Sequence, residues 1–229
     1  MGAANAGFLV SKSVRTRYRS FCLLLIGVGM MWGSSGCVSY GNVTPDAEPV
    51  RANGKLVSMP ANAPSISQGF NPRIPGAQRQ EARAQHNGID IRAEHGTPVI
   101  APASGRVSDA YFSVMYGRCL TIDHGNDAQG RPLASHYFHL AERTVDIGQY
   151  VMRGQQIGSV GMSGLLAGFP HLHYEIRRGT DTWLSQPLNP HLFWQAGVGV
   201  VTCYDKTVHF PDTPFATTFP VPCRGVSWR

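Results

Sequence analysis

His171-Leu172-His173-Tyr174-Glu175-Ile176 is the stretch that decides the fold of this chain. Apolar and polar residues alternate along it and β-favouring residue types are present, which predicts a strand. Side chains two positions apart in a strand lie on the same face, roughly 7 Å from each other, so His171 and His173 face one space. Imidazole is the commonest metal ligand and the usual acid/base group near neutral pH. The pair is therefore either a metal and acid/base pair or two ordinary hydrogen-bonded histidines, and partners elsewhere in the chain distinguish the two.

A second stretch, His86-Asn87-Gly88-Ile89-Asp90, supplies candidate partners. In a straight strand His86 and Asp90 would be roughly 13 Å apart, too far for one metal ion with bonds of about 2 Å. Asn87-Gly88 is a turn signal, however, and a bend there would bring the two side chains together. With that bend, His86, Asp90 and one histidine of the later pair form a three-ligand set, which leaves a fourth tetrahedral position open, as in catalytic zinc sites.

Composition narrows the class of protein. The chain has 229 residues, of which 42% are hydrophobic, enough for one domain or slightly more. The net charge of +6 does not indicate a nucleic-acid partner, because Lys12, Arg15, Arg17 and Arg19 lie in the first 36 residues, which hold no acidic residue. The rest of the chain carries little net charge and shows no basic patch with interleaved aromatics, so no nucleic acid is expected as a partner.

Residues 1–36 have the pattern of an export signal. Basic residues precede an apolar run, Phe21 to Trp32, that is too short to span a bilayer comfortably. Small residues then precede Cys37, and this arrangement resembles a bacterial lipoprotein signal with Cys37 as the lipidated first residue of the mature protein. Ordinary cleavage and an uncleaved anchor are the alternatives. The resemblance implies a periplasmic lipoprotein of a Gram-negative bacterium, anchored in the outer membrane, since Val38 is not the residue that retains such proteins at the inner membrane.

Short β-rich runs are dense from His86 onward, within a folded domain expected over residues 65–195. Gly-containing turns separate them, which predicts an all-β domain, an antiparallel β-sandwich or open barrel, rather than a βαβ fold. The expected strands are residues 97–101, 105–112, 117–123, 133–140, 155–160 and 171–178. Residues 37–64 are rich in Pro, Asn, Ala and Ser and predict a flexible linker. Residues 196–229, with four prolines, predict an irregular C-terminal extension.

The cysteines of the extension are Cys203 and Cys223. Because exported proteins form disulfides, we expect the two to pair, which would stabilise the fold by about 3 kcal/mol on the chain-entropy model. Two free thiols are the alternative. Cys119 lies in a strand-like run and is expected to be a buried core thiol.

One more stretch, Ser135-His136-Tyr137-Phe138-His139-Leu140, holds two histidines three positions apart. Residues three apart lie on opposite faces of a strand. We therefore expect only one of the two to face the cleft, and the spacing alone does not say which.

Together these segments resemble the LytM/lysostaphin-type zinc endopeptidases. The matching segments are His86-Asn87-Gly88-Ile89-Asp90-Ile91, Gly96-Thr97-Pro98-Val99, Tyr137-Phe138-His139-Leu140 and His171-Leu172-His173-Tyr174-Glu175-Ile176, within roughly residues 65–180. The resemblance implies the duplicated hybrid motif fold with an open groove, and hydrolysis of peptide bonds in peptidoglycan cross-links or stem peptides. It assigns His86, Asp90 and His173 as ligands of Zn2+, and His139 and His171 as the catalytic histidines.

All five positions hold the residue that the resemblance requires. Some relatives with this fold have lost ligands and act as amidase activators, so the alternative function is a non-catalytic regulator or a wall-binding module. The roles of the two catalytic histidines, the bond that is cleaved, and any activating or inhibiting protein partner stay open. The other histidines are not expected to bind the metal, and His136 is expected to face away from it. These histidines are His95, His124, His136, His191 and His209.

Overall fold

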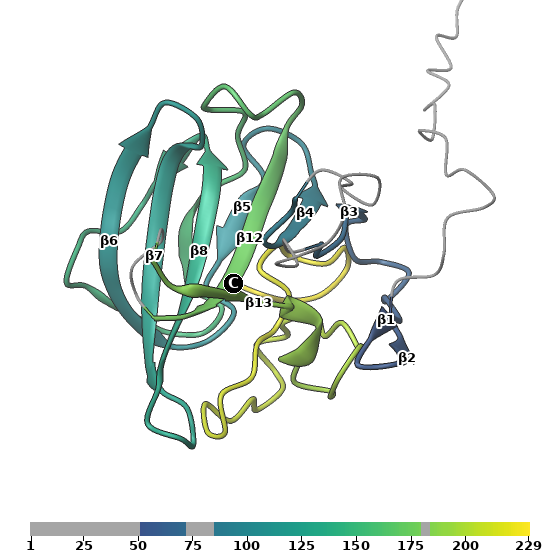
Figure 1. Ribbon diagram of the computed structural model, residues 1–229. Helices are drawn as coiled ribbons and strands as arrows, with labels where there is room; N and C mark the ends of the chain where they lie inside the picture. Colours follow the sequence, from purple (N-terminus) through teal and green to yellow (C-terminus); the bar gives the residue numbers. More distant parts are fainter. Residues whose placement is uncertain (1–50, 72–84, 180–183) are drawn as a thin grey trace, which may run out of the picture. The chain divides into compact units, whose positions relative to one another are not determined.

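The computed structural model describes residues 51–71, 85–179 and 184–229. The expected export signal, Cys37 and residues 37–50 of the expected linker lie outside the described residues. Within the described ranges the secondary structure consists of antiparallel strands and one short 3-10 helix, as Figure 1 shows. The predicted all-β antiparallel fold is thereby confirmed. In this described part, no helix has both the length and the apolar character needed to cross a membrane.

The largest sheet has eight strands, in the order β10-β6-β7-β8-β12-β4-β3, with β13 paired to β12 beside this path. Its strands are β3 (Ile66–Gln68), β4 (Ile89–Arg92), β6 (Gly105–Ser113), β7 (Gly117–Asn126), β8 (Pro132–Leu140), β10 (Tyr150–Val151), β12 (His171–Arg178) and β13 (Gln186–Leu188). A three-stranded sheet contains β5 (Pro98–Ile100), β11 (Gln156–Ser159) and β9 (Glu142–Arg143), and a small hairpin contains β1 (Arg51–Ala52) and β2 (Lys55–Leu56). The 3-10 helix η2 spans Pro190–Leu192.

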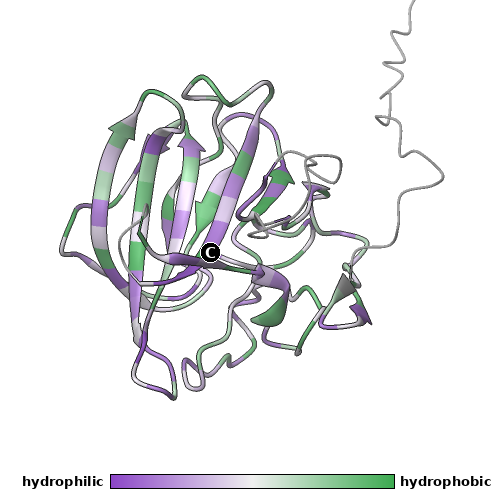
Figure 2. Cartoon of the chain, in the orientation of Figure 1, coloured by the Kyte–Doolittle hydropathy of each residue, from purple (hydrophilic) through white to green (hydrophobic). Residues whose placement is uncertain are grey.

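The alternation of apolar and polar residues along β12 determines which face of this strand packs on the core. Leu172, Tyr174 and Ile176 are fully buried and join a cluster that includes Val99 and Ile157 of the three-stranded sheet. Hydrophobic and hydrophilic bands follow one another along the long strands in Figure 2. Because neighbouring side chains of a strand point to opposite faces, the histidines between these apolar residues are turned to the face away from the core.

The C-terminal extension is irregular and is fixed to the core. Trp194, Phe219 and Val221 are buried in the main cluster. A disulfide joins Cys203 to Cys223, with their Cα atoms 5.9 Å apart. Buried apolar side chains and a covalent link therefore fix this segment to the core although it forms no strand of the sheets described above.

Residues 51–64 differ from the flexible linker that their composition predicts. Ser58 donates its amide hydrogen to Gly199 at 2.8 Å, and Arg224 donates to Asn62 at 2.9 Å. Val57, Met59 and Ala63 pack against the core cluster. The segment is held in place because its backbone groups pair with the C-terminal extension, which the sequence pattern of the segment alone does not reveal.

Candidate metal centre

The bend expected at Asn87-Gly88 brings His86 next to Asp90. His86 forms an antiparallel bridge with Asn71, and β4 begins three residues later, at Ile89. A Cβ atom on Gly88 would lie 2.2 Å from the carbonyl oxygen of Tyr174, so only glycine lets the chain pass this close to β12. His86 Nε2 lies 3.0 Å from Asp90 Oδ1 as a result.

The pairing of β4 with β12 supplies the third donor. His173 lies directly opposite Asp90 in the ladder. Its Nδ1 atom is 2.7 Å from Asp90 Oδ1 and 3.0 Å from His86 Nε2. All three side chains are buried, and their donor atoms lie within 4.8 Å of one another. Tetrahedral zinc with bonds of about 2.0–2.1 Å has ligand atoms about 3.3 Å apart, so small outward shifts would fit these three donors to the ion.

Hydrogen bonds at the far side of each imidazole select the nitrogen that faces the centre. His86 Nδ1 donates to the carbonyl oxygen of Gly69 at 2.7 Å, which leaves Nε2 for a metal. His173 Nε2 lies 2.9 Å from Glu175 Oε1, which leaves Nδ1. Metal-binding histidines are usually held in this way by a carbonyl or a carboxylate, and the donor set of two imidazoles and one carboxylate suits zinc.

The electrostatics of the cluster favour a positive charge at its centre. Burial would raise the pKa of Asp90, but hydrogen bonds to His173 and His86 outweigh it and hold this pKa below its usual range. Burial would lower the pKa of His173, but hydrogen bonds to Asp90 and Glu175 raise it to about 9. Two ionised carboxylates on either side of one imidazole attract a cation, and a divalent metal ion would supply that charge.

The two expected catalytic histidines lie beside this cluster. His171 Nδ1 donates to the carbonyl oxygen of Phe169 at 2.8 Å, and its Nε2 lies 3.7 Å from Asp90 Oδ1. His139 Nδ1 donates to the carbonyl oxygen of Ser163 at 2.8 Å. The two rings are 4.8 Å apart between centroids. Burial lowers the pKa of His139 to about 4, so its imidazole is neutral at pH 7.

The expectation that the two histidines of β8 lie on opposite faces of the sheet is wrong, although only His139 of the two lines the cavity. The partner of His136 in the ladder is Glu175, so His136 lies on the same sheet face as His173, where its Nδ1 is 3.1 Å from Thr121 Oγ1. Strict alternation would turn His139 to the core instead. His139 has a φ of 61°, and this left-handed backbone directs its ring into the site. Both histidines of β8 thus lie on one face, because the strand departs from regular geometry near its end.

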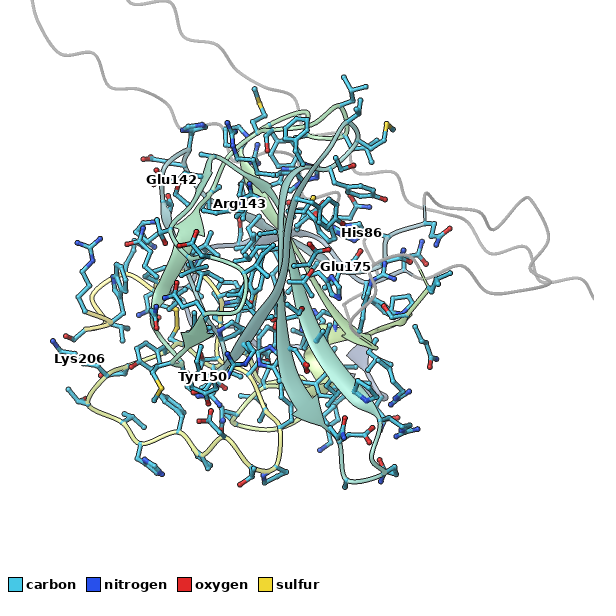
Figure 3. All side chains as sticks on the ribbon, turned by 90° about the vertical axis from the view of Figure 1, so that its left-hand side faces the viewer. His86, Glu142, Arg143, Tyr150, Glu175 and Lys206 are labelled. Atoms are coloured by element: carbon cyan, nitrogen blue, oxygen red, sulfur yellow. A yellow bond between two sulfur atoms is a disulfide. The ribbon has the colours of Figure 1, made fainter. Side chains whose placement is uncertain are left out.

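The three candidate metal ligands and the two expected catalytic histidines line one cavity of about 300 Å³. Its wall also includes Gln68, Tyr116, Leu166 and Glu175. Figure 3 shows the labelled His86 and Glu175 next to each other, away from Glu142 and Arg143. Among the described residues, the set His86, Asp90 and His173 is the one group with metal-binding geometry.

Two residues that serve the site were not singled out from the sequence. Glu175 follows His173 by two positions, so its place on the same strand face was available as a signal. Ser163 holds His139 through its carbonyl oxygen, but it comes from a loop 24 residues further along. Neither the sequence around His139 nor the sequence around Ser163 indicates that these two residues meet.

Comparison with known proteins agrees with this geometry. Residues 84–190 match the model of peptidase family M23. Over 113 residues the chain is 40% identical to the peptidoglycan DD-endopeptidase ShyA of Vibrio cholerae, covering 48% of this chain and 24% of that protein. Over 111 residues it is 39% identical to an uncharacterized metalloprotease of Haemophilus influenzae, covering 48% of this chain and 22% of that protein.

A solved zinc-containing peptidase from Vibrio cholerae aligns with 30% identity and a TM-score of 0.44, over 56% of this chain and 38% of that one. The chain matches about a quarter of the length of the two relatives. The family match, residues 84–190, includes all five histidine and aspartate side chains of the site. The segment that carries the site is therefore similar to peptidase family M23 over residues 84–190.

Proposed function

We propose that this protein is a zinc-dependent endopeptidase that hydrolyses peptide bonds in peptidoglycan cross-links or stem peptides. The observation that carries the proposal is the convergence of His86, Asp90 and His173 at a cavity that His139 and His171 also line. The family of the domain supports peptidase chemistry, and the relative ShyA, named a peptidoglycan DD-endopeptidase, supports the cell wall as the substrate.

His86 Nε2, Asp90 Oδ1 and His173 Nδ1 would hold the zinc ion. When bound, zinc polarises the scissile carbonyl and lowers the pKa of a water molecule to about 7. Asp90 supplies one negative charge to the site, so the bound ion keeps a net positive charge toward the substrate. Three protein ligands would leave one tetrahedral position of the ion for water or substrate, as a catalytic site requires.

His139 and His171 would move protons and stabilise charge. In each ring Nδ1 is occupied by a backbone carbonyl, so Nε2 is the atom available to the reaction. A neutral His139 can accept the proton of the attacking water and pass it to the leaving amine. The other imidazole, whose ring centroid lies 4.8 Å away, can donate a hydrogen bond from Nε2 to the oxyanion that develops on the carbonyl when both of its nitrogens carry a proton.

The substrate requires export, because peptidoglycan lies outside the cytoplasmic membrane. We infer from residues 1–37 that the chain is lipidated at Cys37 and anchored to a membrane, facing the periplasm. Labelled fatty acid should enter the parent protein and not a Cys37→Ser variant. A parent protein that takes up no label contradicts the anchor and leaves the peptidase proposal untouched.

The activity is tested with the purified, zinc-loaded chain and isolated peptidoglycan, with mass spectrometry of the released muropeptides. His139→Ala should keep stoichiometric zinc and lose about 10²–10⁴ in rate, the usual worth of an acid/base group. Asp90→Ala should lose both zinc and activity. His209→Ala, at an exposed position outside the site, is the matched control and should behave as the wild type.

Two outcomes contradict the proposal. Full activity in a zinc-free Asp90→Ala protein would remove the metal from the mechanism. A wild-type protein that holds stoichiometric zinc yet releases no new peptide termini from peptidoglycan would favour the alternative, a regulator or a wall-binding module.

A further inference from the structure

A buried chain of polar side chains continues from the metal centre along β12. His173, Glu175 and Arg177 are spaced by two, so they lie on one face of the strand. Glu175 Oε1 lies 2.9 Å from His173 Nε2, and Glu175 Oε2 accepts a hydrogen bond from Arg177 Nε. Arg177 also donates to the carbonyl oxygen of Ser185 at 2.9 Å. The three residues are 6%, 2% and 6% exposed.

Glu175 divides its two oxygens between the metal-binding histidine and the arginine. A buried carboxylate is costly unless it is paired and hydrogen-bonded, and a buried ion pair is not by itself a stabilising feature compared with apolar packing. An ion pair with Arg177 would need only one edge of the carboxylate. The second oxygen instead meets the ring nitrogen of His173 that faces away from Asp90.

The two candidate histidine ligands are thus held by different acceptors. His86 donates to a neutral carbonyl, that of Gly69, whereas His173 donates to an ionised carboxylate. A hydrogen bond to a charged acceptor is shorter and stronger than a neutral one, and it makes the opposite ring nitrogen a better donor to a metal. The carboxylate therefore acts on the metal through His173 without touching it.

We propose that Glu175 is the positioning residue of the metal site: it fixes the ring orientation and the tautomer of His173, with Arg177 holding the carboxylate in place. This inference rests on the proposed function only in taking His173 as a zinc ligand. It assigns to β12 both a ligand and the support of that ligand, on one face of one strand. The support is internal to the domain and independent of the substrate.

The test measures metal binding and not peptide cleavage. Full-length wild type and Glu175→Gln are freed of metal and titrated with zinc against a chromophoric chelator. The amide keeps the size of the side chain and removes its charge, and the dissociation constant for zinc should rise about 10–100-fold, the usual effect of losing such a partner. The absorption spectrum of the Co2+-substituted protein should change as well, because the ligand geometry changes.

Glu142→Gln is the control, since Glu142 lies on the other sheet and accepts a hydrogen bond from Ser159 at 3.2 Å. Its zinc dissociation constant and Co2+ spectrum should match those of the wild type. A folded Glu175→Gln protein with wild-type zinc affinity and an unchanged Co2+ spectrum overturns the proposal, even when the metal-free protein is less stable, because that pattern describes a purely structural residue.

Arg177→Gln is a second variant that tests the same inference if Glu175→Gln does not fold. It leaves the contact between Glu175 and His173 possible and removes the group that holds the carboxylate. It should weaken zinc binding in the same direction by a smaller factor, and unchanged affinity overturns the inference. If the variants change zinc affinity as expected but the wild type cleaves no peptide, the proposed function is wrong and the role of Glu175 stands. The zinc titration and the cleavage assay therefore test the two proposals separately.

Discussion

Gly164 lies where two loops beside the site meet backbone to backbone, and replacing it with alanine should impair the enzyme without removing its metal. Its φ is 87°, and an added Cβ would lie 2.3 Å from the amide nitrogen of Gly117 and 2.6 Å from the carbonyl oxygen of Met115. The residue before it, Ser163, accepts the hydrogen bond from His139 Nδ1 at 2.8 Å. Separating the loops therefore moves the atom that holds His139, the proposed acid/base residue.

The chain offers a matched control for the backbone cost. Gly148 also has a φ of 87°, and an added Cβ there meets nothing within 4 Å. Gly148→Ala should lower the free energy of unfolding by about 1–2 kcal/mol, the cost of a left-handed conformation with a side chain. Gly164→Ala should add about 1–3 kcal/mol for forcing atoms into a packed contact, for a total of about 2–5 kcal/mol.

The assay compares denaturant unfolding, zinc content and the rate of muropeptide release for both variants. A catalytic group misplaced by about 1 Å can cost about 10² in rate, so Gly164→Ala should lose up to that factor in kcat at full zinc occupancy. Gly148→Ala should keep the wild-type kcat. Equal unfolding free energies and equal rates for the two variants would refute the reasoning, since the loop contact would then carry neither stability nor the position of His139.

The remaining predictions concern stability. Cys203→Ser with Cys223→Ser opens a link between residues 20 positions apart and should lower the free energy of unfolding by about 3 kcal/mol; an unchanged denaturant midpoint would contradict this. His191 is buried, and burial lowers its pKa to about 4, while its Nδ1 accepts a hydrogen bond from Trp194. The unfolded chain, with a histidine pKa near 6.5, binds this proton first as the pH falls, so stability should decrease from about pH 6.5 down to about pH 4, by about 3 kcal/mol in total. His191→Gln should flatten that part of the pH–stability curve, and parallel curves for the two proteins would show that this histidine does not contribute.

The amino-acid sequence by itself determined the parts of this protein that follow local rules. Strand alternation has a period of two, so the apolar residues of 171–176 identify the core face and the histidines between them identify the other face. The Asn87-Gly88 turn signal marked the bend that His86 and Asp90 need, and glycine-bounded β-rich runs predicted the antiparallel all-β fold. Each of these patterns can be followed along a single segment.

Only the tertiary structure decided what depends on contacts between distant segments. Both histidines of β8 lie on one face because a left-handed residue, held by Ser163, breaks the alternation. Residues 51–64 pack on the C-terminal extension because each supplies hydrogen-bond partners that the other lacks. The role of Glu175 appears once the register of β12 with β4 places Asp90 at the opposite nitrogen of His173. Such features arise from the pairing of chain segments, and a local period carries no information about which segments meet.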